Sequence, residues 1–262
     1  MGSKHSIEEL NSISHSIELQ DASETEIQTM LDDLKNPSKQ INSIYIYYSF
    51  LSLKHISMIF KNLKNVTTLS ITNSELNDDA IKIICQSLLT NTTLVDLQLS
   101  HNKISDKGAK YIKELLFVNQ TLKKLNLANN QIGDDGVYHL SEALLFNVSL
   151  ENLHLSKNPI TEDGVHKLKT SIKYNPFIMQ VSVDQSINLV PKNTQSDRNK
   201  NYEDWILGDE YKDMIMDICD KIYQKYPLES KEIVKKFKTS TETIYNSILG
   251  ECLTNKFKDD QI

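Results

Sequence analysis

The sequence has few cysteines and no long apolar run. Among its 262 residues, Cys85, Cys219 and Cys252 lie too far apart for a disulfide framework or a paired metal knuckle. No stretch approaches the roughly 20 apolar residues that a membrane-spanning helix needs. The first 30 residues are polar and do not resemble a secretory signal. These absences predict an intracellular, cytoplasmic protein.

Motifs for catalysis are missing as well. With only seven glycines, the chain has no phosphate-binding loop, and G-x-S-x-G, H-E-x-x-H and C-x-x-C do not occur. The seven histidines show no metal-ligand spacing. We therefore expect no enzymatic activity, no catalytic residue, no metal and no cofactor. The formal net charge of −6 argues against nucleic acid as a partner, because such binding depends on neutralising phosphates.

A repeat of 28 residues dominates the middle of the chain. It is marked by apolar residues at this spacing, namely Val66, Leu94, Leu122, Leu150 and Ile178. The clearest units read LVDLQLSHNKIS, LKKLNLANNQIG and LENLHLSKNPIT. Their shared pattern is L-x-x-L-x-L-x-x-N-x-I, and such regular repetition predicts a stacked array in which neighbouring units bury a common core.

Each unit is predicted to be a strand, a turn and a helix. The x-L-x-L pair has the period of two of a strand, and the Asn that follows can satisfy backbone groups in a tight bend. Next come an N-cap residue, an acid suited to a helix N-terminus, a small residue for close packing and an i, i+4 apolar stripe. These turn and N-cap positions are Asn102, Asn130 and Asn158, and Asn77, Ser105, Gly133 and Thr161.

Two further positions on the helices carry expectations. An Asn ends each helix, at Asn91, Asn119, Asn147 and Asn175. Asn tolerates the left-handed conformation, so we expect it to end the helix in that way. Cys85 lies where other units carry Lys113, Ser141 and Lys169, which predicts a solvent-facing thiol.

On these motifs the sequence resembles the leucine-rich repeat proteins. The 28-residue period and the full helix resemble the ribonuclease-inhibitor subtype, which is found in NOD-like receptors, tropomodulins and Ran GTPase-activating proteins. The resemblance implies an α/β fold, a curved solenoid with parallel strands on the concave face and helices on the convex face. It covers about residues 13–184. A GTPase-regulating role is an alternative, although no residue set carries over and the acidic tail of that family is missing.

The chain divides into four predicted parts. Residues 1–12 form a polar tail, and residues 13–184 form the solenoid, with a degenerate N-terminal cap at 13–40 that contains a capping box from Ser23 to Glu26. Residues 185–201 are polar and predict a linker. Residues 202–262 predict a small all-helical bundle or cap.

The C-terminal segment leaves a second function open. Residues 230–249 resemble a helix-turn-helix, so a regulatory or sensor protein whose helical module binds DNA or an effector is an alternative. Its predicted recognition helix has no Arg or Lys on its outer face, and residues 201–262 hold 9 Lys against 13 acids, a net charge of −4. This charge disfavours contact with phosphates.

The concave face is the predicted binding surface, and another protein is the predicted partner of a monomeric scaffold. Residues between the core positions of each strand face outward there. The candidates are Tyr45, Tyr47, Ser70, Asp96, Gln98, Lys124, Asn126, Asn152, His154 and Gln180. The row is polar with little net charge. Tyr45 and Tyr47 either form a binding hot spot or cover the irregular first repeats.

The N-terminal sequence MGSKHS fits the myristoylation pattern at Gly2. One such chain binds membranes only marginally, and no second signal lies nearby. A membrane is therefore expected as a partner only if Gly2 is modified.

Overall fold

The computed structural model describes residues 15–175, 177–184 and 188–189. The tail at 1–12, Gly2, most of the predicted linker and the C-terminal segment at 202–262, with its helix-turn-helix resemblance, lie outside these residues. Two residues of the predicted linker form a strand instead, Asn188–Leu189 (β8). Leu189 packs half-buried against the core, and this burial of apolar surface favours pairing of the dipeptide with the sheet.

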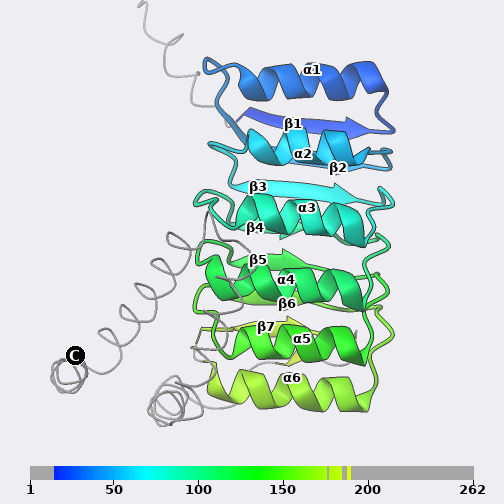
Figure 1. Cartoon of the computed structure of the whole chain (residues 1–262), viewed down its shortest axis with the longest axis vertical. Helices are drawn as coiled ribbons and strands as arrows, with labels where there is room; N and C mark the ends of the chain where they lie inside the picture. The colour runs from blue at the N-terminus through cyan, green and yellow to red at the C-terminus, as the bar shows by residue number, and fades with distance from the viewer. Residues whose placement is uncertain (1–14, 176, 185–187, 190–262) are drawn as a thin grey trace, which may run out of the picture.

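One sheet and one layer of helices make up the described fold (Figure 1). Strands follow one another in chain order, β1 to β7 are parallel, and β8 pairs antiparallel with β7. The strands are β1 (His15–Gln20), β2 (Ile41–Tyr47), β3 (Thr68–Thr72), β4 (Asp96–Gln98), β5 (Lys124–Asn126), β6 (Asn152–His154) and β7 (Gln180–Ser182). The helices are α1 (Glu24–Lys35), α2 (Leu53–Lys61), α3 (Asp78–Leu88), α4 (Asp106–Val118), α5 (Asp134–Leu144) and α6 (Glu162–Tyr174). The predicted α/β solenoid is confirmed, with its helices stacked along one face of the sheet.

The predicted periods place the core. Leu97 and Leu99 in β4 and its extension are each 1 % exposed, and the equivalent leucines of the next two units are buried in the same way. Ile84 and Leu88 supply the buried stripe of α3. At the N-terminal end, the capping box of Ser23 and Glu26 begins α1 as predicted. No unit buries its apolar face alone, so stability comes from the stacking of neighbours.

Buried asparagines join the turns of adjacent units, as predicted. Asn102 Oδ1 accepts from the backbone N–H groups of Ser74 and Leu76, both at 3.1 Å. Its Nδ2 donates to the carbonyl of Ile71 at 2.8 Å. All three partners belong to the preceding unit. Two of these three bonds, the one from the anchor N–H and the one to the strand carbonyl, recur at Asn130 and Asn158.

The expectation for the Asn residues at the helix ends is wrong in its mechanism. Asn119 (φ −79°, ψ 119°) and Asn175 (φ −87°, ψ 115°) are extended rather than left-handed, and neither Asn91 nor Asn147 has positive φ. Asn119 instead donates from Nδ2 to the carbonyl of Leu88 at 2.9 Å, in the preceding unit. The residue type is required for a bond between units and not for backbone freedom.

Cys85 is not solvent-facing, as the sequence had led us to expect. It is 5 % exposed and lies in the core, at a position from which α3 faces the next helix. The equivalent Lys113 is half-buried, and it donates to Glu142 in the following helix at 2.8 Å. At Cys85 and Lys113 the repeat position is therefore an interface with the next helix, Ser141 is buried there as well, and only Lys169, on the last described helix, is exposed.

The predicted acidic and small positions form an interlock between neighbouring helices. Asp106 Oδ1 accepts from the backbone N–H of Gly133 at 2.6 Å and of Gly136 at 3.0 Å, so it caps the next helix, whose own N-cap has no side chain. In the following unit, the hydroxyl and then the backbone N–H of Thr161 donate to Asp134, and this lowers the pKa of the Asp134 carboxyl.

Gly136→Ala tests this interlock. Replacing Gly by Ala inside a helix normally stabilises it by up to about 1 kcal/mol. Here the added Cβ would lie 2.5 Å from Asp106 Oδ1 and 2.7 Å from Ile132 Cγ2. We expect the free energy of unfolding to fall by about 2 kcal/mol, measured by urea denaturation. The matched change Ala80→Gly, where the preceding helix begins with Leu53 instead of an acid, should lose only about 1 kcal/mol through helix propensity. An increase in stability for Gly136→Ala would contradict the interlock.

Candidate functional site

The concave face, which we define as the surface of the parallel sheet that the helices leave uncovered, presents its side chains in rows. Strand register places five of the predicted residues side by side across β2 to β6, in the order Tyr45, Ser70, Gln98, Asn126 and His154. A second row crosses β4 to β7, in the order Asp96, Lys124, Asn152 and Gln180. The structure therefore brings the predicted residues together on one surface, with Tyr47 one step further along β2.

Most of these side chains are half-exposed, and Lys124 is exposed. Ser70 is the exception, because it is only 4 % exposed and leaves little surface for a partner. Asp96 accepts a hydrogen bond from Gln98 on the same strand, so part of the row is already ordered. A strip of amides and hydroxyls with one cation and one anion can make many directional hydrogen bonds, and it has no arrangement of nucleophile and base.

Two tyrosines form the aromatic end of the strip. The rings of Tyr45 and Tyr47 stack with centroids 6.4 Å apart and planes 16° apart. Burial, together with the carboxylate of Glu18 on β1, raises the pKa of the Tyr47 hydroxyl. Both rings are half-buried, so they cover the irregular first units and also present surface. The two interpretations from the sequence are therefore compatible.

The loop from β2 to α2 and the first residue of α2 expose three apolar side chains. Tyr48 is 59 % exposed, Phe50 is 79 % exposed and Leu53 is 46 % exposed. We call Tyr48, Phe50 and Leu53 the edge patch. Sequence reasoning missed Leu53. The sequence could have identified it, because Leu53 is apolar at the first helical position, where an acid begins the later repeat helices, namely Asp78, Asp106, Asp134 and Glu162.

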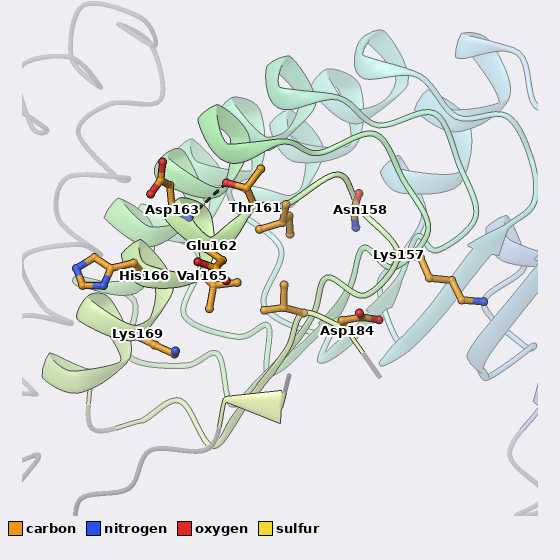
Figure 2. Close-up of a pocket in the computed structure, with 11 residues that line it drawn as sticks. Lys157, Asn158, Thr161, Glu162, Asp163, Val165, His166, Lys169 and Asp184 are labelled. Atoms are coloured by element: carbon orange, nitrogen blue, oxygen red, sulfur yellow. Dashed lines mark hydrogen bonds between the residues drawn. The ribbon is translucent and has the colours of Figure 1, made fainter. Parts of the chain in front are cut away.

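A hollow of about 970 Å³ lies at the C-terminal end of the stack (Figure 2). The loop with Lys157 and Asn158, the first turns of α6, and Asp184 surround it. Glu162 occupies the position from which Asp106 and Asp134 hold the following helix. The hollow is therefore the open side of the last helical unit that the structure describes.

Two further findings concern metal binding and membrane spanning within the part of the chain that the structure describes. No group of three or more His, Cys, Asp or Glu side chains there could hold a metal ion. In the same part, no helix combines the length and apolar character that crossing a membrane requires.

Comparison with known proteins agrees with the fold. Residues 90–113, 118–141 and 146–169 match the family model described as a leucine-rich repeat. These three segments match leucine-rich repeats, as the sequence predicted, and the ribonuclease-inhibitor subtype remains a prediction. A solved structure of leiomodin-1 actin-binding site 2 aligns with 18 % identity and a TM-score of 0.45, over 69 % of this chain and 94 % of that chain. The comparison with curated proteins finds no match.

Proposed function

We propose that this chain is a non-catalytic scaffold that binds another protein on the concave face. The observation that supports the proposal is the strip of half-exposed polar side chains across β4 to β6, which lies in register with the stacked pair of Tyr45 and Tyr47 on β2, with the buried Ser70 between them. Parallel strands hold these side chains at fixed spacing, so little order has to be gained on binding. Tyrosine supplies large contact area with a polar tip, which suits it to the centre of an interface.

The strip also indicates how a partner would be recognised. Gln98, Asn126 and Asn152 carry amides that donate and accept, and Lys124 and Asp96 supply one charge of each sign. Such a surface favours a polar, folded protein surface over a highly charged polymer. Shape and hydrogen-bond complementarity over several units would carry specificity, and the tyrosine pair would carry much of the affinity.

The test is affinity capture with the full chain, followed by measurement of Kd with the purified partner. The double variant Tyr45→Ala, Tyr47→Ala should weaken binding by roughly 30-fold or more, which corresponds to about 2 kcal/mol. The control is Lys82→Ala, Lys110→Ala, which removes two exposed cations from the helices. Circular dichroism must show that both variants are folded. Unchanged Kd in the folded tyrosine variant, or loss of binding in the control, would place the site elsewhere.

A further inference from the structure

The edge patch stands out when the repeats are compared with one another. The edge patch lies three residues before, one residue before and two residues after the buried anchor Leu51. In the next four units, whose anchors are Leu76, Ile104, Ile132 and Ile160, the same three positions carry polar or charged residues and one proline. These are Asn73, Glu75 and Asp78; His101, Lys103 and Asp106; Asn129, Gln131 and Asp134; and Lys157, Pro159 and Glu162. The middle position, that of Phe50, is exposed in every one of these units.

The backbone at Tyr48 disfavours the residue that occupies it. Tyr48 has φ of +51°, in the left-handed region. The equivalent residues of the other units, also with positive φ, are Asp21, Asn73, His101, Asn129 and Lys157. Asn, Asp and His are the non-glycine residues that adopt this region most readily, whereas a bulky aromatic residue rarely does. Backbone preference therefore does not explain why a tyrosine occupies this position, and more than half of its side chain is exposed.

Leu53 shows the same conflict. It is the first residue of α2, where a carboxylate would interact favourably with the helix N-terminus. The structure gives it 46 % exposure instead of a place in the core. Both side chains leave about half of their surface exposed, and the chain places them on either side of the buried anchor Leu51.

Carboxylates flank the edge patch. Asp21 donates its backbone N–H to the carbonyl of Tyr47 at 3.1 Å, so it lies beside Tyr48. Glu24 lies 3.0 Å from His55, in the first turn of the helix that Leu53 begins. Both acids are exposed, and Lys54 is an exposed cation next to Leu53, whereas Glu75 pairs with Lys103. Two exposed acids against one exposed cation make the surroundings net acidic.

We propose that the edge patch binds a protein segment that carries apolar side chains next to Lys or Arg. The apolar side chains would cover Phe50 and Leu53, and the cations would face Asp21, Glu24 and the exposed Tyr48 ring. The inference goes beyond the proposed function, because it concerns the loop at the sheet edge and different residues from those of the concave face.

The test selects random 16-residue peptides displayed on phage against the full chain. Enriched peptides should have net positive charge and carry Leu, Ile or Phe beside Lys or Arg. Synthetic versions should bind the edge variant Tyr48→Asn, Phe50→Gln, Leu53→Gln at least tenfold more weakly than the natural chain. This variant copies Asn129 and Gln131 of another unit. It takes Gln at position 53 because Ala80 stands where the other units have the glycine that makes room for the first-turn carboxylate. Its melting temperature should therefore not fall. The matched control Tyr138→Gln, Met179→Gln removes two exposed apolar side chains elsewhere and should leave Kd unchanged.

Several results would overturn the proposal. One is enrichment of peptides without cations, or no enrichment at all, as would follow if residues 190–262 occupied the patch. Another is equal binding to the edge variant. A third is a dimer in sedimentation experiments that only the edge variant abolishes, which would make a second copy the occupant. If a captured protein is lost with the Tyr45, Tyr47 variant and kept by the edge variant, the concave-face function stands and the edge proposal fails.

Discussion

Replacing Asn147 with Ala should lower the free energy of unfolding by about 3–5 kcal/mol. The side chain is 1 % exposed and makes four hydrogen bonds to the backbone. Its Nδ2 donates to the carbonyls of Leu116 (2.8 Å) and Asn119 (3.1 Å) in the preceding unit. Its Oδ1 accepts from the N–H groups of Ser149 (3.0 Å) and Leu150 (2.7 Å). Alanine would leave these backbone groups without partners in a place that water does not reach, so the loss should exceed that of one ordinary hydrogen bond.

Asn65→Ala provides the control, because Asn65 lies in the corresponding helix-to-strand loop of an earlier unit and is exposed. Its change in stability should stay within about 0.5 kcal/mol. Urea denaturation followed by far-ultraviolet circular dichroism measures both variants. A loss below about 1 kcal/mol for Asn147→Ala would mean that water or a shifted loop replaces the missing bonds, and that the helix-end Asn is dispensable.

The sequence predicted the units well because one period repeats through the chain. Leu125 and Leu127 differ by two, which identifies a strand, and Asn130 follows at a fixed offset that only a turn explains. Each unit confirms the next, so errors of one or two residues in a single element do not spread. The same argument predicted the rows of the concave face, since alternation alone separates Gln98 and Asn126 from the leucines beside them.

The mistakes concern what lies across from a residue in the next unit. Periodicity shows that Asn119 recurs, but it does not show that its amide reaches the carbonyl of Leu88. Cys85 looked solvent-facing because its equivalents include lysines, yet Lys113 at that position is half-buried against Glu142. Burial of Ser70 has the same origin, because large tyrosines on β2 lie beside it. Contacts between units depend on side-chain size and reach, which a pattern of residue classes does not encode.

Removing one whole repeat should leave a folded protein, whereas removing half as many residues should not. Deletion of residues 122–149 takes out 28 residues and joins Thr121 to Leu150. Each lost partner then has a substitute in register. Asp106 would cap Thr161 as Asp134 does now, and Asn158 would accept from the N–H of Ile104 as it does from Ile132. We expect one cooperative urea transition. Its m-value should be lower by about one sixth, because m scales with the surface exposed on unfolding and the deletion removes 28 of the roughly 170 residues that the structure describes.

Deletion of residues 122–135 is the matched control. It removes β5 and its turn but keeps most of α5, so α4 would run into a helix that has no strand beneath it. The sheet would lose the pairing of β4 with β5 and of β5 with β6. The core leucines of β4 and β6 would then have no neighbouring strand to pack beside. Because a solenoid is held together only by contacts between neighbours, we expect this shorter deletion to abolish the cooperative transition. Equal losses from the two deletions would show that chain length governs stability here, and that the 28-residue register does not.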